Sequence, residues 1–274
     1  MSIDAHFHCW QLDRGDYSWL TPALGPIYRD ERVTDWQQQA TPHGVTGGVL
    51  VQAAPTEAET QFLLAQANAN PVVLGVVGWL DLLAPDAPEC IASLARHPRL
   101  KGLRPMLHDI SDPQWILQPA LERALRAMED QGLVFDALVK PEHLPHILTL
   151  AQRHPHLKIV IDHAAKPDIA ARQWQPWADD MARLAQETAA VCKLSGLMTE
   201  AGADAAPGAV RHWADHVLQC FGPRRVLWGS DWPVLELAGS YAQWHDETMN
   251  VLAQLSPQDR EAVMGGNARR IYGL

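Results

Sequence analysis

Short apolar runs rich in β-branched residues recur along the chain, and segments with helical spacing lie between most of them. Several of these runs are nearly continuous, such as VVLGVVGW, LVFDALV and LKIVIDH. Continuous apolar strands are typical of parallel sheets that are covered by helices on both faces. The runs predict eight strands, at residues 2–6, 47–52, 72–79, 100–104, 133–139, 157–163, 190–194 and 225–229.

The segments between the strands predict crossover helices at residues 57–70, 88–97, 118–131, 142–154, 175–188, 208–220 and 241–255. Ser256-Pro257 marks the start of a last helix. Eight strands that alternate with helices over about 250 residues indicate an α/β fold, a distorted (β/α)8 TIM barrel. A doubly wound sheet is the main alternative, but it usually has a Gly-rich loop after its first strand, where this chain reads H-F-H-C-W.

The chain shows no linker or charge run that would divide it, so residues 1–274 are predicted to form a single barrel domain. Residues 11–45 are too irregular for an ordinary βα unit. They are predicted to form a long loop over the barrel mouth, packed down by Trp19, Tyr28 and Trp36.

Composition restricts the classes of partner. The chain has 22 Lys and Arg against 32 Asp and Glu, a net charge of −10, which disfavours nucleic-acid binding because phosphate contacts need clustered cations. A hydrophobic content of 47% excludes a disordered chain. The N-terminal sequence has no secretory pattern, and no apolar run is long enough for a membrane helix, so we expect a cytoplasmic protein without a membrane partner. The composition does not predict the oligomeric state.

Ionisable or polar groups follow almost every predicted strand. In a (β/α)8 barrel the carboxyl ends of the strands form the active site, so we expect these side chains to meet there. Packing alone does not explain polar groups at so many strand ends. In chain order they are His6, His8, Gln52, Asp81, Arg104, His108, Asp136, Asp162, His163, Lys166, Lys193, Ser195 and Asp231.

His6 and His8 alternate at the end of the first strand, so both imidazoles should point to the same side. This geometry suits metal binding or hydrogen bonding to one substrate oxygen. Asp231 follows the apolar run VLWGS, where it could bind a metal, act as a general base on water, or cap the next helix. His163, in I-V-I-D-H-A, is either a site residue or a hydrogen-bonded core histidine.

The remaining candidates would bind substrate. Arg104, His108 and Lys166 can donate hydrogen bonds, although Arg104 could instead form a structural ion pair with Asp136 or Asp81. Three tryptophans adjoin the candidate catalytic groups and could form the wall of a pocket for a small polar molecule, or simply pack in the core. They are Trp10, Trp79 and Trp232.

Five ordered motifs, I-D-A-H-F-H-C-W, L-K-G-L-R-P, I-D-H-A-A-K-P, C-K-L-S-G and L-W-G-S-D-W-P, resemble the amidohydrolase superfamily. The closer resemblance is to the branch that contains sugar lactonases and pyrone-dicarboxylate lactonases. It spans essentially the whole chain and implies a barrel that hydrolyses a lactone. His6 and His8 match the first-strand pair of that family, His163 its sixth-strand histidine, and Asp231 its eighth-strand aspartate.

The chain departs from the metal-binding members of the superfamily. These usually add a Lys or Glu on strand 4 or a His on strand 5, where this chain has Arg104 and Asp136. At most one divalent metal, zinc first, is therefore expected, held by His6, His8 and Asp231, with His163 as a further candidate. Metal-free catalysis is the alternative.

The sequence thus predicts a hydrolase that opens an aldonolactone, with Asp231 activating water and His163, His6 and His8 polarising the carbonyl. Three alternatives stay open: a pyrone-dicarboxylate lactonase, a metal-dependent decarboxylase on the same barrel, and a binding protein without activity. Arg104 and Lys166 are few cations for two carboxylates, which favours a neutral sugar lactone.

Overall fold

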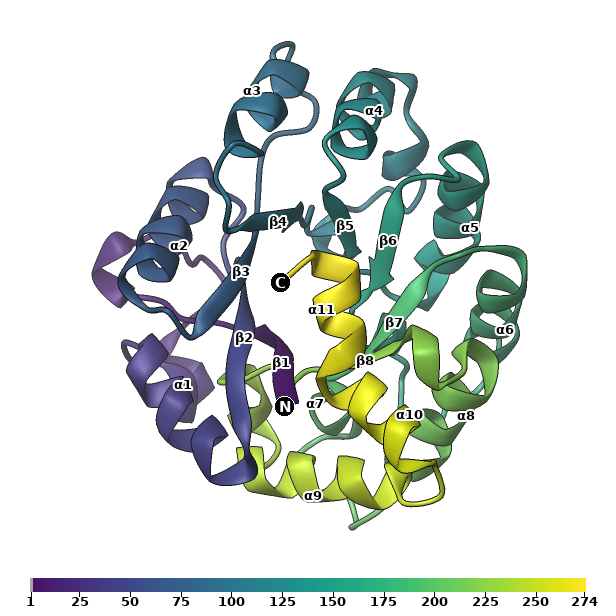
Figure 1. Ribbon diagram of the computed structural model, residues 1–274. Coiled ribbons are helices and arrows are strands. Elements are labelled where there is room, and N and C mark those ends of the chain that lie inside the picture. The colour runs from purple at the N-terminus through teal and green to yellow at the C-terminus, as the bar shows by residue number, and fades with distance from the viewer. Residues whose placement is uncertain (1) are drawn as a thin grey trace.

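The computed structural model describes residues 2–274 and contains one eight-stranded parallel sheet in the order β1 to β8. Figure 1 shows the strands as a ring with the helices outside it. The predicted (β/α)8 fold and all eight strands are confirmed, with strand ends that differ from the prediction by one or two residues. The strands are β1 (Ser2–Phe7), β2 (Val45–Val51), β3 (Val73–Gly78), β4 (Leu100–Leu103), β5 (Val134–Ala137), β6 (Lys158–Ile161), β7 (Val191–Leu194) and β8 (Val226–Trp228).

The crossover helices are also confirmed. The helix predicted at residues 118–131 begins later, because a 3-10 turn that starts at Pro119 precedes it. Ser256 caps the helix that follows it, as predicted, by accepting a hydrogen bond from the Asp259 amide. The helices are α2 (Glu57–Ala69), α3 (Ala87–Leu94), α4 (Glu122–Asp130), α5 (Leu144–Arg153), α6 (Trp177–Glu187), α7 (Leu197–Ala201), α8 (Arg211–Phe221), α9 (Tyr241–Leu252), α10 (Pro257–Glu261) and α11 (Asn267–Tyr272).

The segment between β1 and β2 is only partly the loop that we predicted, because it contains α1 (Val33–Ala40) and the 3-10 turn η3 (Thr41–His43). Trp36 packs as expected: it is buried and stacks on Phe7, with ring centroids 4.0 Å apart. The packing role predicted for Tyr28 is wrong, since its side chain is exposed. The assignment of residues 1–274 to one domain stays a prediction.

The first and last strands close the ring through two backbone hydrogen bonds beyond the end of β8. The amide of His8 donates to the Trp232 carbonyl at 2.8 Å, and the amide of Asp231 donates to the His6 carbonyl at 2.8 Å. Residues from the two ends of the sequence are thereby held side by side. The closure of the barrel itself places Asp231 beside the two first-strand histidines.

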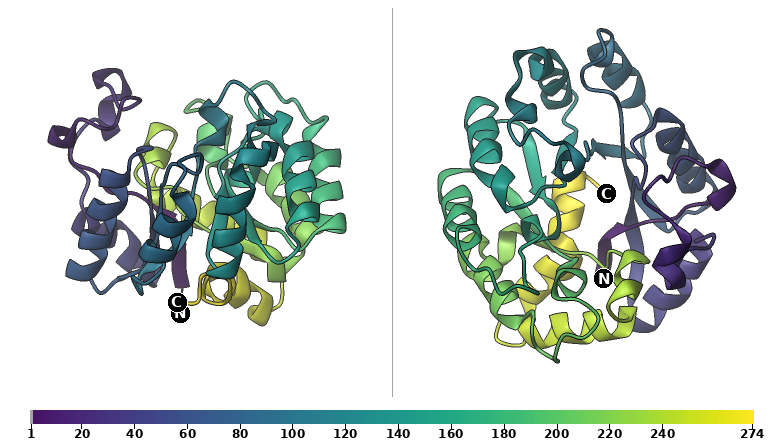
Figure 2. Two further views of the ribbon diagram at one scale, coloured as in Figure 1. Left: turned by 90° about the horizontal axis from the view of Figure 1, so that it is seen from above. Right: turned by 180° about the vertical axis from the view of Figure 1, so that it is seen from behind.

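The opposite face of the barrel is covered by α11. Figure 1 shows this helix across the ring, and the left view of Figure 2 places α11 and both termini at one end and the purple segment that follows β1 at the other. Tyr272 on α11 is buried and donates to Asp136 inside the barrel at 2.9 Å. The face at the carboxyl ends of the strands is therefore the one available for a site. Within the described residues, no helix has both the length and the apolar character needed to cross a membrane.

Candidate active site

A pocket of about 200 Å³ lies at the carboxyl ends of the strands. Its walls come from segments far apart in the sequence, as expected for a barrel site. Many of the predicted residues meet there: His8, Arg104, His108, His163, Lys166 and Asp231. The other lining residues are Trp19, Ala53, Met106, Asp109, Leu138 and Val234.

Three imidazoles converge on a single carboxylate oxygen. Oδ1 of Asp231 lies 3.2 Å from Nε2 of His8, 3.6 Å from Nε2 of His6 and 3.7 Å from Nε2 of His163. The Nε2 atoms of His6 and His8 are 3.2 Å apart, which confirms that the alternation along β1 directs both rings to the same side. All four side chains are buried, so their mutual interactions are little screened by water.

The hydrogen bonds of His8 limit where its protons lie. Nδ1 is 2.8 Å from the Val51 carbonyl oxygen, which can only accept, so Nδ1 carries a proton. In a neutral ring Nε2 would then present a lone pair to the Asp231 carboxylate. That contact is favourable only when Nε2 is also protonated or when a cation lies between the two atoms. Nε2 of His8 can therefore act as a hydrogen-bond donor to Asp231, as a partner of Nε2 of His6, or as a metal ligand.

The backbone at this site adopts conformations that L-residues rarely adopt. Asp231 has φ +60°, and residues 163–166 all lie in the left-handed region, with φ between 49° and 60°. Two glycines make room for the histidines. A Cβ on Gly196 would lie 2.8 Å from Cβ of His163, and one on Gly229 would lie 2.8 Å from Cβ of His6. These glycines belong to the motifs C-K-L-S-G and L-W-G-S-D-W-P, so both motifs contribute to the packing of the site.

The protonation of the central groups follows from burial and from their neighbours. Burial alone would raise the pKa of Asp231, but His163, which is charged at the low pH where Asp231 titrates, and the hydrogen bond from His8 outweigh burial, so the pKa lies below its ordinary value. Asp231 is therefore ionised at neutral pH. Burial lowers the pKa of His163 to about 4 although Asp231 opposes this shift, so that ring is neutral. Its Nδ1 lies 2.9 Å from Oγ of Ser195, which fixes the ring orientation.

Beneath the pocket, a buried lysine contacts His6. Nζ of Lys193 lies 3.2 Å from Nδ1 of His6, 2.5 Å from Asp136 and 2.9 Å from Asp162. Burial and the charge of Lys193 hold the pKa of His6 well below its ordinary value. We did not assign a role to Lys193 from the sequence, although a lysine inside the apolar strand VCKL was a usable signal.

Arg104 lines the pocket but is already paired. Its guanidinium lies 3.2 Å from Asp162 and donates to the side chain of Gln52 at 2.9 Å. The ion pair is thus with Asp162, directly after β6, and not with Asp136 or Asp81. Nη1 of Arg104 is also 3.4 Å from Nε2 of His6, close to the histidine cluster.

Two further predicted residues, His108 and Lys166, line the pocket. Lys166 forms an ion pair with Glu200. His108 is largely buried, and burial together with Arg104 lowers its pKa to about 3, so it is a neutral donor and acceptor. The cations that line the pocket, Arg104 and Lys166, are therefore each neutralised by a carboxylate.

The three predicted tryptophans are not among the pocket-lining residues. Trp10 is buried against Trp19, with ring centroids 5.5 Å apart, and Trp232 is buried and donates to Glu236 at 2.8 Å. Trp79 lines an adjacent pocket. Trp19 packs the segment down on Trp10, as predicted, and it also lines the pocket that contains the histidines.

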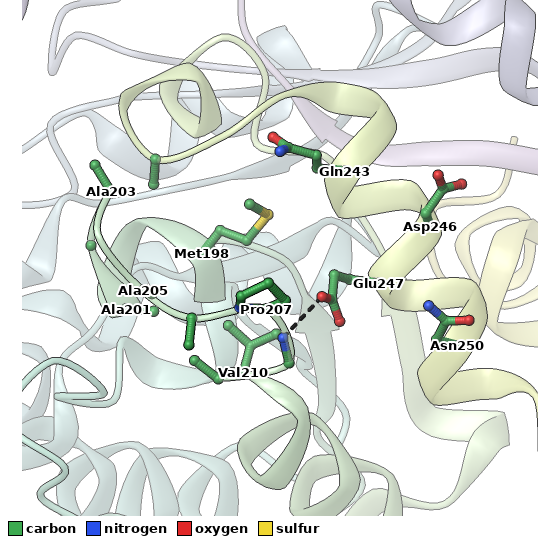
Figure 3. A pocket seen from close by; sticks show the side chains of 15 residues that line it. Met198, Ala201, Ala203, Ala205, Pro207, Val210, Gln243, Asp246, Glu247 and Asn250 are labelled. Atoms are coloured by element: carbon green, nitrogen blue, oxygen red, sulfur yellow. Dashed lines mark hydrogen bonds between the residues drawn. The ribbon is translucent and has the colours of Figure 1, made fainter.

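A larger pocket of about 330 Å³ lies elsewhere, between the α7–α8 segment and α9 (Figure 3). Figure 3 shows a wall of small apolar side chains such as Ala203 and Ala205 facing the polar side chains of Gln243 and Glu247. The lining contains no histidine and shares no residue with the histidine pocket. The ionisable groups that line the larger pocket are Asp246 and Glu247, whereas the smaller pocket combines imidazoles with a buried carboxylate, so the smaller pocket is the stronger candidate for catalysis.

The histidine cluster has a donor set that can hold a divalent metal. The ligand atoms of His6, His163 and Asp231 all lie within 4.8 Å of one another, and those of His6, His8 and Asp231 are separated by 3.2 to 3.6 Å. Tetrahedral zinc, with bonds of about 2.1 Å, separates its ligand atoms by about 3.4 Å. The donors therefore fit zinc in chemistry and spacing, although the guanidinium of Arg104 lies beside them.

Known proteins resemble this chain along nearly its whole length. The sequence profile of the Amidohydrolase family matches residues 3–274. The chain is 45% identical to an L-fucono-1,5-lactonase of Burkholderia ambifaria, over 99% of this chain and 95% of that one. It is 34% identical to an L-fucono-1,5-lactonase of Burkholderia multivorans, over 100% and 96% of the two chains. A crystal structure of a Burkholderia multivorans amidohydrolase with bound zinc has a TM-score of 0.94 and 33% identity, and covers 100% of this chain and 99% of that one.

Proposed function

This chain belongs to the Amidohydrolase family, and on that premise we propose that it opens an aldonolactone with Asp231 as the base. It is a hydrolase of sugar lactones, as its lactonase relatives indicate over nearly its whole length. The single observation that carries the assignment of roles is the convergence of three imidazoles on Oδ1 of Asp231 inside the pocket.

In the proposed reaction, a water molecule beside Asp231 attacks the carbonyl carbon of the lactone while Asp231 takes its proton. The carbonyl oxygen becomes an oxyanion, which hydrogen-bond donors at the pocket stabilise. His8 and His163 are the proposed donors, because their rings flank Asp231 and lie in the pocket wall. The bond from the carbonyl carbon to the ring oxygen then breaks, Asp231 returns its proton to that oxygen, and a hydroxy acid is released.

The charges at the pocket favour a neutral lactone over a dicarboxylate. Recognition of two carboxylates needs several free cations, with Arg suited to bidentate pairing. Arg104 is engaged by Asp162 and Gln52, and Lys166 is engaged by Glu200. Hydroxyl groups of a sugar lactone can instead bond to the neutral ring of His108 and to the exposed carboxylate of Asp109. We propose L-fucono-1,5-lactone as the first substrate to test, because two relatives carry that activity in their names.

We further propose that His6, His8 and Asp231, with His163 beside them, hold one zinc ion. A bound divalent cation would polarise the lactone carbonyl as a Lewis acid. The metal-free alternative uses protonated His8 as the donor and has support in the cations that contact His6, which would repel a metal. Metal analysis before and after chelation, paired with the rate, separates the two. Full activity without metal assigns oxyanion stabilisation to the protein itself, whereas loss that is restored by zinc assigns the metal a role.

The direct test of function is acid release at neutral pH from a panel of aldonolactones, with Asp231→Asn as the matched variant. We expect turnover of at least one aldonolactone by the wild type and little by the variant. Release of CO2 from an aromatic acid without lactone hydrolysis would support the decarboxylase alternative. Binding of a lactone without turnover would support a non-catalytic protein. A cytoplasmic location stays a prediction.

A further inference from the structure

We propose that His43, His245 and Asp246 form a second cation site, which binds a zinc-like transition-metal ion. The ion would link the first and last βα units of the barrel. The ligand atoms of the three side chains lie within 4.8 Å of one another. His43 ends η3, just before β2, whereas His245 and Asp246 lie on α9, beyond β8. No residue of this group lines the catalytic pocket.

Aromatic neighbours hold the two histidine rings in place. The ring of His43 stacks on Tyr241, with centroids 5.8 Å apart, and the ring of His245 meets Trp228 edge-on at 5.9 Å. The two imidazoles are themselves neighbours, with centroids 4.6 Å apart. Two of the three ligands are therefore largely preorganised, which reduces the entropy lost on binding an ion.

One nitrogen in the group lacks the partner that burial requires. Nδ1 of His245 is inaccessible to solvent and has no hydrogen bond to any of residues 2–274. It lies 3.5 Å from Oδ1 of Asp246, which is longer than an ordinary hydrogen bond. A buried polar atom without a partner costs free energy. An ion held between His245 and Asp246 would supply the partner that this nitrogen lacks.

The third ligand has room to move. The Asp246 side chain is 75% exposed, and Figure 3 shows it on α9, pointing away from Glu247, which is held by the amide of Gly208. Zinc separates its ligand atoms by about 3.4 Å, so the group must contract slightly around an ion. Rotation of the exposed Asp246 carboxylate can provide most of this movement at little cost.

The ligand set decides the kind of ion. Two imidazole nitrogens and one carboxylate oxygen suit Zn²⁺, whereas Mg²⁺ and Ca²⁺ prefer oxygen ligands alone. An ion here would connect the η3–β2 junction to α9. It would therefore stabilise the part of the ring where the first and last βα units meet.

The test counts zinc ions bound to metal-stripped protein by equilibrium dialysis with elemental analysis, and measures Tm with and without zinc. We compare the wild type with His43→Gln and Asp246→Asn, which change partly or fully exposed side chains and should fold. The control is Asp130→Asn, which changes an exposed carboxylate at the end of α4. His6→Asn run alongside reports on any zinc at the catalytic cluster.

The proposal predicts that His43→Gln and Asp246→Asn each bind one zinc fewer than the wild type, while Asp130→Asn binds the same number. Zinc at about 100 times its Kd should raise the Tm of the wild type by several degrees. It should raise the Tm of the two site variants by less, with lactone turnover unchanged in both. Equal zinc content and equal Tm shifts in the wild type, His43→Gln and Asp246→Asn would overturn the proposal. Neither result depends on whether the catalytic assignment holds.

Discussion

Nε2 of His8 lies 3.2 Å from Oδ1 of Asp231, and this contact joins the end of β1 to the segment that follows β8. The two residues are far apart in the sequence, and the backbone hydrogen bonds that close the barrel bring them together. Because Nδ1 of His8 donates to the Val51 carbonyl, the Nε2 contact requires a proton or a metal ion. The pair therefore couples the proposed base to one of the proposed hydrogen-bond donors for the substrate.

Asp231→Asn should retain the fold and lose about 10²- to 10⁴-fold in kcat, because an amide cannot take a proton from water. The measurement is the steady-state rate of lactone hydrolysis, together with Tm to confirm folding. Asp109→Asn is the control, since Asp109 also lines the pocket but is 61% exposed and not part of the histidine cluster. Its kcat should change by less than about threefold. An Asp231→Asn enzyme with half of the wild-type kcat would remove Asp231 from the mechanism.

Lys193→Met should destabilise the protein by about 3–5 kcal/mol, because it leaves the buried carboxylate of Asp136 without its cation and leaves Asp162 with Arg104 alone. The measurement is the free energy of unfolding from denaturant titration. The control is Lys158→Met, at the exposed start of β6, which should change that free energy by less than about 0.5 kcal/mol. Equal free energies of unfolding for the two variants would show that the ion pairs of Lys193 with Asp136 and Asp162 do not stabilise the fold.

Glu59 makes the stability depend on pH. It is buried, and burial raises its pKa to about 7 from an ordinary 4.5, despite the hydrogen bond from Tyr17. The folded state thus binds the proton more tightly than the unfolded state. The stability that this tighter proton binding contributes is fully present below the pKa of Glu59 in the unfolded chain. It is lost as the pH rises through the pKa of Glu59 in the folded protein.

Between pH 5 and pH 8 the wild type should therefore lose about 2 kcal/mol of stability relative to Glu59→Gln, whose amide does not titrate. Denaturant titrations of both proteins at the two pH values check this. Subtracting the free energy of unfolding of Glu59→Gln from that of the wild type cancels the contributions of groups that titrate in both proteins. A wild type that gains stability relative to Glu59→Gln as the pH rises would show that Glu59 is ionised in the folded protein at pH 5.

His108→Ala should raise KM by about fivefold and leave kcat nearly unchanged, because the loss of one hydrogen bond to a substrate hydroxyl costs about 1 kcal/mol. His108 lines the pocket but makes no contact with Asp231 in the described residues. His146→Ala, on α5 and away from the pocket, is the control and should change neither constant. A fall in kcat with KM unchanged would instead place His108 in the chemical step.

The positions of His6, His8 and Asp231 could be predicted from the sequence, because they depend only on the regular geometry of strands and of the barrel. Alternation along a strand fixes the shared direction of His6 and His8, and closure of a (β/α)8 barrel brings the end of β8 next to β1. The tryptophans were not predictable in this way. Trp232 adjoins Asp231 in sequence, but neighbouring side chains diverge, so it packs into the core instead.

The buried charged residues beneath the site were harder to infer from the sequence. The sequence places Lys193 and Asp162 among the polar groups expected to meet at the strand ends, but it does not show that both side chains contact His6 beneath the pocket. That depends on the register between neighbouring strands, which no local pattern specifies. Trp19 was missed for a similar reason. It lies in an irregular segment, and only the packing of that segment brings its ring to the pocket.

The most direct test of the central claim compares kcat/KM of the wild type for L-fucono-1,5-lactone and for 2-pyrone-4,6-dicarboxylate, both followed by acid release. Because the cations that line the pocket are already paired with carboxylates, the neutral sugar lactone should be preferred by at least about tenfold, or 1.4 kcal/mol. A tenfold preference for the dicarboxylate would contradict the account.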